Sequence, residues 1–318
     1  MCGDMIQKRW LNQKSSRRAS VLSRRKLLYS CKQPDPRMTT LAYAKINLGL
    51  RVLERRPDGY HTLETIFHRI ALADELTFTS ASTIRMASEV EGLPLDHTNI
   101  CWRAAALLRD ELQCTRGVCI HLHKRIPIGA GLGGGSADAA AVLLHLPAFW
   151  HRTVDSSTLR RIAEHLGSDV PYFLEKGSAV GRGRGEVLEY FPLDIPYWIL
   201  LCNPRLPIAT AWAYARITPA KRDTAPGLKE ILLEGLHDPK GLHGALVNDF
   251  EPVVFATYPL VREVKEEMER RGALFASMSG SGSSVYGFFE REDDALATAR
   301  AFDERGLFTH LTPPHFTV

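Results

Sequence analysis

The stretch PIGAGLGGGSADAA, residues 127–140, places five glycines in one short loop and runs directly into an alanine-rich segment. Glycines let the backbone turn sharply, so successive N–H groups can gather around an anion. A helix beginning at Ser136 would add the positive end of its dipole at the same point. A plain tight turn is the alternative, but five glycines followed by a serine favour a phosphate-binding loop. The loop alone leaves the rest of the ligand open.

Two widespread nucleotide motifs fit this loop poorly. Residues 129–134, GAGLGG, have the G-x-G-x-x-G spacing, yet a dinucleotide site also needs a buried strand before the loop and an acidic residue at the end of the next strand. Here Pro127 interrupts the approach, and Asp155 falls in a helix-capping cluster. The loop lacks the Gly-Lys-Ser/Thr ending of a P-loop, and the chain lacks the V-A-I-K, H-R-D and D-F-G strings of protein kinases.

The positive charge of the chain is concentrated at its start. The 318 residues are 45% hydrophobic and 24% charged, which suits one large or two medium globular domains. Residues 1–37 hold ten lysines or arginines against Asp4 and Asp35, a net charge of +8, whereas the whole chain has a formal charge of +4. The remaining residues are therefore mildly acidic, at about −4. We expect no nucleic-acid partner.

The basic extension, residues 1–37, is rich in arginine and serine and poor in acids, as in an organelle-targeting presequence. An over-long reading frame with the true start at Met38 is the alternative. We leave this extension out of the fold prediction. The expected location is the cytoplasm, or an organelle if residues 1–37 act as a presequence.

Cysteine usage and hydropathy exclude further classes. The six cysteines form no C-x-x-C pair and no Cys/His cluster with zinc spacing, so buried free thiols in a reducing compartment are expected. No apolar run in the sequence reaches the length of a membrane-spanning helix. We therefore predict a soluble protein with a small-molecule ligand and no membrane partner.

Hydrophobic periodicity outlines the secondary structure. Alternation over residues 40–54 predicts a strand with one apolar face and one face that carries Lys45 beside Asn47. Other predicted strands cover 61–79, 117–127, a hairpin over 178–191, 197–203, 273–278, 283–289 and 308–312; predicted helices cover 98–112, 136–146 with Pro147 as the stop, 156–166, 208–216, 227–235, 257–271 and 292–304. This mixed order, without a clean βαβ series, predicts an α+β fold in two lobes.

Three motifs in the same order resemble those of the GHMP small-molecule kinases, which include galactokinase, homoserine kinase and mevalonate kinase. PIGAGLGGGSADAA resembles the phosphate loop of that family, and the other two motifs are AYAKINLGL, residues 42–50, and SMSGSGSSVYG, residues 277–287. The resemblance implies a two-lobed α+β GHMP kinase fold. It places an ATP-binding lobe of ribosomal-protein-S5-like topology at residues 38–195 and a ferredoxin-like lobe at residues 196–318.

Two further segments resemble one branch of that family. They are AKINLGLRVLERRPDGYHTLET, residues 44–65, and HLGSDVPYFL, residues 165–174. This branch phosphorylates the 2-hydroxyl of a cytidine-diphosphate-linked methylerythritol in non-mevalonate isoprenoid biosynthesis. The resemblance therefore implies that substrate, with ATP and Mg²⁺ as cofactors, in a monomer or homodimer. A GHMP kinase of the homoserine or mevalonate type and a non-catalytic nucleotide-binding relative remain as alternatives.

The resemblance assigns Lys45 and Asp169 as the catalytic pair. Phosphoryl transfer needs a group that accepts the hydroxyl proton and a cation that stabilises charge on the attacking oxygen. A carboxylate beside a lysine meets both needs. Without the motifs, Asp169 would be read as a helix cap and Lys45 as a solvated strand residue.

The residues matching the family's nucleotide site surround the loop. Ser136 is expected to contact a phosphate or Mg²⁺, or to cap the helix, and no metal ligand is assigned firmly. Asp138 stands where a small or amide side chain is expected. The predicted ATP-binding set is Asn99, Lys124, Pro127, Ile128, Gly129, Ala130, Gly131, Leu132, Gly133, Gly134, Gly135, Ser136 and Ala137.

The acceptor site is expected to recognise a cytosine. The ring nitrogens of His61 can donate and accept hydrogen bonds, and Tyr60 offers a ring for stacking. Thr210 and Tyr214 match the second stacking position across the pocket. Residues 279–284, SGSGSS, are expected to support the phosphate loop and to contact the phosphates of the acceptor. The predicted acceptor-binding set is Asn47, Tyr60, His61, Thr210, Tyr214, Gly280 and Gly282.

Overall fold

The protein is described by a computed structural model that covers residues 37–219 and 226–318. Within this part of the chain, two β-sheets form the framework, one with six strands and one with four. Apart from Arg37, the predicted basic extension lies outside the described residues. The predicted division at residues 195 and 196 falls between the strands of the two sheets and stays a prediction.

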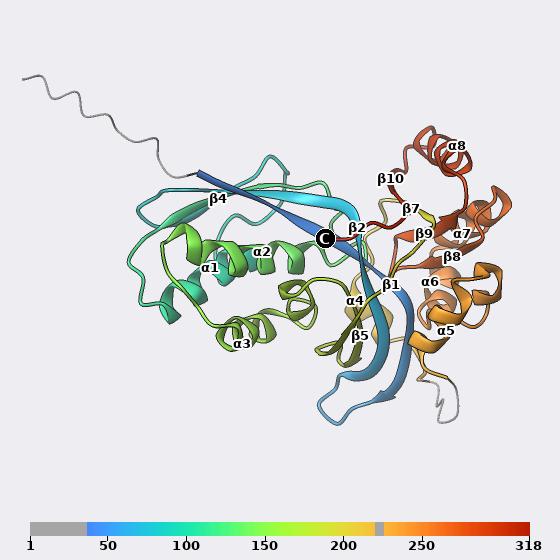
Figure 1. Ribbon diagram of the computed structural model, residues 1–318, viewed down its shortest axis with the longest axis horizontal. Helices are drawn as coiled ribbons and strands as arrows, with labels where there is room; N and C mark the ends of the chain where they lie inside the picture. The colour runs from blue at the N-terminus through green and yellow to red at the C-terminus, as the bar shows by residue number, and fades with distance from the viewer. Residues whose placement is uncertain (1–36, 220–225) are drawn as a thin grey trace, which may run out of the picture. The chain divides into compact units, whose positions relative to one another are not determined.

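The larger sheet is built around one long antiparallel hairpin. Its strands are β1 (Arg37–Arg55) and β2 (His61–Thr79), joined by the predicted turn. The other strands are β3 (Ile84–Ala87), β4 (Val118–His123), β5 (Ser178–Gly183) and β6 (Val187–Phe191). Their order is β3-β4-β2-β5-β6, with β1 paired to β2. Figure 1 shows the hairpin, in blue, as the longest pair of strands in the molecule.

The predicted alternation holds for only the first part of β1. Ala42 and Ala44 are buried while Leu41 is 44% exposed, but every residue from Lys45 to Val52 is buried. The second face of the strand is covered there because the chain near residue 248 packs against it. Leu50 N donates to Val247 O at 2.8 Å, and Lys45 Nζ donates to Gly131 O at 3.2 Å, so the polar face that carries Lys45 lies inside the molecule.

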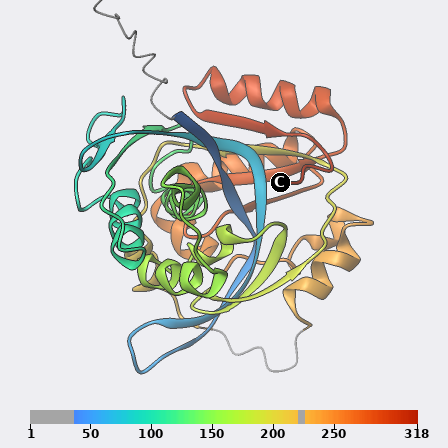
Figure 2. The ribbon, with the colours of Figure 1, turned by 60° about the vertical axis from the view of Figure 1, so that its left-hand side comes forward.

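Two helices, α1 (Ile100–Glu111) and α2 (Gly134–Phe149), pack on the larger sheet, and α3 (Ser156–Leu166) packs on these two helices. Figure 2 views α2 nearly end-on among its neighbours, and its small side chains let most of its residues pack closely against them, although Leu144 is exposed. The predicted bounds of this helix were wrong at both ends. It begins at Gly134, and it continues through Pro147 because the loss of one hydrogen bond near its end is offset by the burial of Leu146 and Phe149.

The smaller sheet has the strand order β10-β7-β9-β8 and is antiparallel throughout. Its strands are β7 (Trp198–Asn203), β8 (Phe275–Met278), β9 (Val285–Phe289) and β10 (Phe308–Thr312), with α7 (Pro259–Arg270) and α8 (Glu292–Asp303) packed on them. The other helices are α4 (Thr210–Tyr214), α5 (Leu228–Gly235) and α6 (Glu251–Thr257), with 3₁₀ turns at Pro171–Leu174 and Pro239–Leu242. In chain order the strands lie 4-1-3-2, which is the predicted ferredoxin-like arrangement.

Most predicted elements are confirmed within a few residues, but β3 and α6 were not predicted. Ile84–Ala87 is only four residues long, and the predicted helix over 257–271 corresponds to α7 alone, from which Tyr258 separates the short α6. No helix in residues 37–219 and 226–318 has the length and apolar character to cross a bilayer. The described cysteines are free thiols, as expected: Cys101, Cys114, Cys119 and Cys202.

Candidate active site

A cleft with two arms lies beside the glycine loop. The loop arm has a volume of about 520 Å³ and is lined by residues 127–136, Lys45 and Asn99. The aromatic arm has a volume of about 840 Å³ and is lined by Tyr60, His61 and Tyr214. The residues that line both arms define their junction: Asp169, Arg184, Thr210 and Tyr214.

The backbone carbonyls of the glycine loop are anchored to the protein. Gly131 O accepts from Ser279 Oγ at 3.0 Å, and Leu132 O accepts from Lys45 N at 3.0 Å. In a trans peptide the N–H points opposite to the C=O of the same unit. The amides of residues 132 and 133 therefore face away from these anchors, toward the loop arm.

The first turn of α2 supplies three more donors. The amides of Gly134, Gly135 and Ser136 donate to no acceptor among the described residues, and the N-cap Gly133 offers no side chain to them. Orphan N–H groups at a helix N-terminus, together with the helix dipole, form an anion site. The expectation that Ser136 caps the helix was wrong, because its hydroxyl stands inside the first turn, where it lines the cleft.

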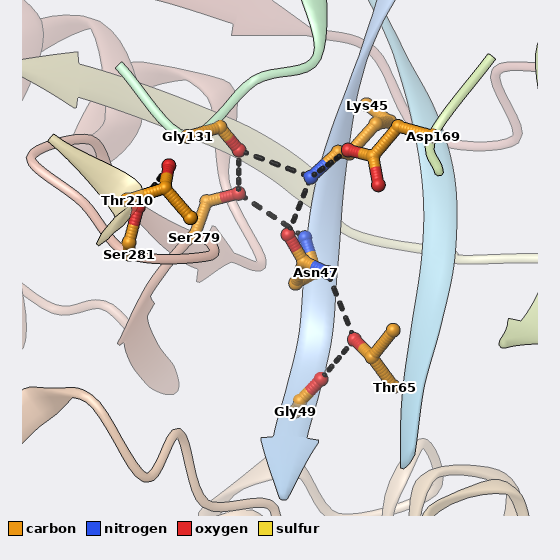
Figure 3. Close-up of polar contacts among 9 residues, drawn as sticks. All are labelled: Lys45, Asn47, Gly49, Thr65, Gly131, Asp169, Thr210, Ser279 and Ser281. Carbon is orange, nitrogen blue, oxygen red and sulfur yellow. Dashed lines mark hydrogen bonds and ion pairs between the residues drawn. The ribbon is translucent and has the colours of Figure 1, made fainter. Parts of the chain in front are cut away.

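Lys45 reaches from β1 to the junction of the two arms. Its ammonium donates to Asn47 Oδ1 at 2.7 Å and to Gly131 O at 3.2 Å, and it lies 3.4 Å from Asp169 Oδ2 (Figure 3). The Lys45 side chain is 5% exposed, whereas that of Asp169 is 34% exposed. The sequence placed these two residues 124 positions apart, and the fold brings them together with the carboxylate facing the cleft.

Asn47 is held in one orientation by a chain of hydrogen bonds. Its Nδ2 donates to Thr65 Oγ1 at 2.9 Å, and that hydroxyl donates to Gly49 O at 2.6 Å (Figure 3). The amide oxygen is therefore left to face Lys45. Asn47 N also donates to Ser279 Oγ at 3.2 Å, so one network joins β1, β2 and the loop after β8.

The aromatic arm holds stacked rings and a tethered loop. The rings of His61 and Tyr214 stack with centroids 5.1 Å apart at 22°. Tyr60 is 56% exposed, and the Arg184 guanidinium lies 5.0 Å from its ring centroid. Thr210 Oγ1 and Ser281 Oγ are 3.1 Å apart, which ties α4 to the loop after β8.

Two pKa shifts favour the uncharged forms of the stacked rings in this arm near neutral pH. Burial, and then the nearby Arg55, lowers the pKa of His61, so its imidazole is neutral and can both donate and accept. Burial, and then the charge of Asp169, raises the pKa of Tyr214 to about 12. The rings of His61 and Tyr214 thus offer flat, uncharged surfaces, while Arg55 lies elsewhere in the arm and Asp169 and Arg184 lie at the junction.

Two family models match the chain. The model described as GHMP kinases N terminal domain matches residues 99–177, and the one described as GHMP kinases C terminal matches residues 225–306. A 4-diphosphocytidyl-2-C-methyl-D-erythritol kinase from Chlorobium limicola is 45% identical over 282 residues, which cover 87% of this chain and 97% of that protein. The chain belongs to the GHMP kinase family.

Further comparisons show which GHMP kinases this protein resembles most in sequence and which share only its fold. A 4-diphosphocytidyl-2-C-methyl-D-erythritol kinase from Prosthecochloris aestuarii is 49% identical, covering 81% of this chain and 91% of that protein. A crystal structure of 4-(cytidine 5'-diphospho)-2C-methyl-D-erythritol kinase has a TM-score of 0.73 and 38% identity, covering 87% of this chain and 99% of the other. Homoserine kinase from Cytophaga hutchinsonii, with a TM-score of 0.68, 19% identity and coverage of 92% and 100%, shares the fold. As a GHMP kinase, the protein uses ATP.

All the predicted site residues of this GHMP kinase line one of the two arms except Gly282 and Ala137, and Ala137 is buried within α2. Gly282 does not line either arm, and a Cβ there would lie 2.7 Å from Met278 Sδ, so the glycine serves packing. Lys124 lines the loop arm, but its ammonium is held by two carboxylates under the loop. Asn99 also lines the arm, although its side chain caps α1 by accepting from Cys101 N at 2.8 Å.

The sequence analysis did not identify Asp74, a buried carboxylate that organises the start of the loop. Asp74 Oδ1 accepts from the amides of Arg125 and Ile126 at 2.6 and 2.8 Å, and Oδ2 accepts from Lys124 Nζ. The same ammonium donates to Asp138 Oδ2 at 2.9 Å. Two carboxylates and one ammonium thus connect β2, the entry to the loop and α2. Arg184 at the junction and Thr65 were also not predicted.

Asp74 and Asp138 differ in how many donors stabilise their negative charge. Asp74 accepts from three donors, whereas Asp138 accepts from Lys124 alone and its Oδ1 has no partner among the described residues. Burial raises the pKa of Asp138 to about 8, even though Lys124 pulls it down. In the folded kinase, Asp138 is therefore largely protonated at neutral pH.

We expect the stability of the kinase to fall with rising pH because of Asp138. Its pKa is raised above the unfolded value of 3.8, so between that value and about 8 the folded state binds the extra proton. The quantity to follow is the free energy of unfolding of the wild type minus that of Asp138→Asn. We expect this difference to fall by up to about 1.4 kcal/mol per pH unit in this window and to level off above it. Urea unfolding of both proteins from pH 5 to 9 measures this; a constant difference would contradict it.

A glycine substitution tests the docking of the loop. A Cβ at Gly131 would lie 2.2 Å from Ser279 O, whereas a Cβ at Gly129 meets no atom within 4 Å. Both glycines have a positive φ, of 76° and 67°, so both alanine variants lose about 1–2 kcal/mol. We expect Gly131→Ala to lose a further 1–3 kcal/mol or so through overpacking. Equal urea midpoints for the two variants would show that the loop is not docked on Ser279.

Proposed function

We propose that the protein transfers the γ-phosphoryl group of ATP to the 2-hydroxyl of 4-diphosphocytidyl-2-C-methyl-D-erythritol, giving the 2-phosphate and ADP. The observation that carries the proposal is the Lys45–Asp169 pair, 3.4 Å apart where the loop arm meets the aromatic arm. A phosphate chain in one arm and an alcohol bearing a base in the other would meet at this pair. The similarity to kinases of that name supports the acceptor.

Asp169 is the proposed general base. Its carboxylate accepts the proton of the acceptor hydroxyl while that oxygen attacks the γ-phosphorus, and the bond from this phosphorus to the bridging oxygen of ADP breaks. Lys45 stabilises the negative charge on the attacking oxygen. Because its ammonium is buried and oriented by Asn47 and Gly131, it needs little reorganisation during the step.

The glycine loop is the proposed binding site for the phosphates of ATP. Its outward amides and the first turn of α2 provide donors, and Gly129 leaves open space above the loop. The remaining predicted residues, Asn99, Lys124 and 127–137, then surround the nucleotide. Lys124 would act mainly by holding the loop, since its ammonium is hydrogen-bonded to Asp74 and Asp138.

Ser136 is the residue that fits Mg²⁺. Its hydroxyl lines the loop arm beside the orphan amides and makes no hydrogen bond to another described residue. No group of three or more His, Cys, Asp or Glu side chains in the described part of the chain could hold a metal. A kinase Mg²⁺ is held mainly by substrate phosphates and one or two protein groups, so this setting is sufficient. When bound, Mg²⁺ neutralises charge on the phosphate oxygens.

The aromatic arm is the proposed cytidine site. Tyr60 and Tyr214 present rings, and the neutral His61 can pair with the edge of a cytosine. One face of each tyrosine ring is already engaged, by Arg184 and by His61 respectively. Asn47, Thr210 and Gly280 line the way from this arm to Asp169 and are the proposed contacts for the rest of the acceptor.

A coupled ADP-release assay tests the proposed function. The panel contains 4-diphosphocytidyl-2-C-methyl-D-erythritol, homoserine, mevalonate and galactose, each with ATP and Mg²⁺. We expect turnover with the cytidine-containing alcohol alone. Turnover only with an alcohol that lacks cytidine would indicate a different GHMP kinase, and ATP binding without turnover on any of them would indicate a nucleotide-binding relative.

A further inference from the structure

Arg184 occupies a rigid turn between β5 and β6, beside the proposed general base. Its amide donates to Glu186 Oε2 at 2.6 Å, and the flanking Gly183 and Gly185 have φ values of 70° and 108°. A Cβ placed on Gly185 would lie 3.9 Å from Asp169 Oδ1. The backbone that carries Arg184 is therefore fixed, and it runs alongside the junction of the two arms.

The guanidinium of Arg184 has N–H donors that make no hydrogen bond to another described residue. Its carbon lies 5.0 Å from the centroid of the Tyr60 ring, and its Nε lies 3.5 Å from Glu186 Oε1. Neither terminal nitrogen has a hydrogen-bond partner among the described residues. The side chain is 36% exposed and lines both arms. An arginine fork with free donors is suited to bidentate recognition of phosphate.

The other cations of the loop arm are already committed. Lys45 is shared among Asn47, Gly131 and Asp169, and Lys124 is held between two buried carboxylates. The loop amides serve the phosphates of ATP in the proposed function. The proposed acceptor carries a diphosphate of its own between its cytidine and the alcohol that reacts. This second anion must lie between the aromatic rings and Asp169, which is where Arg184 stands.

We infer that Arg184 binds the diphosphate of the acceptor and so selects a nucleoside-diphosphate-linked alcohol. The inference rests on the proposed function, which places the cytidine in the aromatic arm. Because Arg184 also contacts Tyr60, a base placed against that ring brings its 5'-phosphates toward the guanidinium. The residue acts in binding the acceptor, with no part in binding ATP.

Arg55 provides a matched control. It is the other arginine among the described residues that line the aromatic arm, but it stands at the end of β1 and does not line the loop arm. Its charge lowers the pKa of His61, so it lies near the base end of the arm. Removing Arg55 takes the same charge from the same arm, at a position away from the junction.

The test is calorimetric binding of cytidine, CMP and CDP to the full chain, with a non-hydrolysable ATP analogue saturating the loop arm. In the wild type we expect CDP to bind more tightly than cytidine. In Arg184→Ala this preference falls by about 10- to 100-fold, the range of a charge-assisted hydrogen bond, while the affinity for cytidine changes by less than about threefold. Arg184→Lys retains part of the preference, and Arg55→Ala retains nearly all of it.

The outcomes distinguish a failure of the proposed acceptor from a failure of the role of Arg184. A wild type that does not prefer CDP to cytidine would overturn the proposed acceptor chemistry itself. A wild-type preference that survives in Arg184→Ala would overturn the role of Arg184 alone. Equal losses for cytidine and CDP in that variant would show that Arg184 only supports Tyr60, and a CDP-specific loss in Arg55→Ala alone would assign the diphosphate to Arg55.

Discussion

Replacing Asp169 by asparagine is expected to lower kcat by about two to four orders of magnitude, the effect of losing a general base. Asparagine has the same shape and can still accept a hydrogen bond from Lys45, which lies 3.4 Å from the present carboxylate. It cannot take the proton of the acceptor hydroxyl. The loss therefore falls on the chemical step, and single-turnover rates with the cytidine-containing acceptor measure it.

Binding measurements show whether the Asp169→Asn effect is chemical. The affinity for an ATP analogue should change little, because the loop amides do not depend on residue 169. Asp194→Asn is a suitable control, since that carboxylate is 68% exposed and pairs with His315 away from the cleft. A kcat within threefold of the wild type in Asp169→Asn would remove the carboxylate from the mechanism.

Replacing Asp74 by alanine is expected to lower the free energy of unfolding by about 3–5 kcal/mol. Asp74 is fully buried and accepts from Lys124, Arg125 N and Ile126 N. Alanine leaves the amides of Arg125 and Ile126 without this acceptor, the second of them buried, and removes one partner of the buried Lys124 ammonium. Urea unfolding at pH 7 measures this loss of stability. A loss of this size would show that Asp74 anchors the entry to the loop.

Asp110→Ala serves as the control for Asp74→Ala. The Asp110 side chain is 74% exposed on α1 and lies 3.7 Å from Arg109 Nε, so its removal should change stability by less than about 0.5 kcal/mol. If Asp74→Ala lost no more than this control, the network under the loop would contribute nothing to the fold. A loss of ATP affinity in Asp74→Ala beyond that in Asp110→Ala would show that the loop entry has moved.

The glycine turns of the loop, the first strand and the cap of α3 could be predicted because they depend on residues close together in the sequence. The five glycines of residues 129–135 indicated where the backbone must turn, and three of them, Gly129, Gly131 and Gly133, do have a positive φ. The alternation from residue 40 predicted β1, and Asp155 caps α3 through Thr158 N at 2.9 Å, as its cluster indicated. These features depend on neighbours a few positions away, so the sequence carries them directly.

Contacts between distant segments explain what the sequence analysis missed. Lys124 was assigned to the nucleotide from its match in the family, and its two buried partners lie 50 and 14 positions away. The register of β2 against β4 decides that Asp74 meets Lys124, and no motif marks that register. Pro147 was taken as a helix stop because the packing of Leu146 and Phe149 cannot be seen from the local pattern.

By itself, the sequence determined the family to which the three ordered motifs belong, and it predicted an anion-binding loop over residues 127–136. Glycine conformation and short periodicity are properties of the chain over a few residues. Only the tertiary structure decided that Lys45 is shared among three oxygens, that Lys124 lies beneath the loop, and that Arg184 keeps donors at the junction. A long side chain can pair with any group within its reach, and folding alone determines which groups those are.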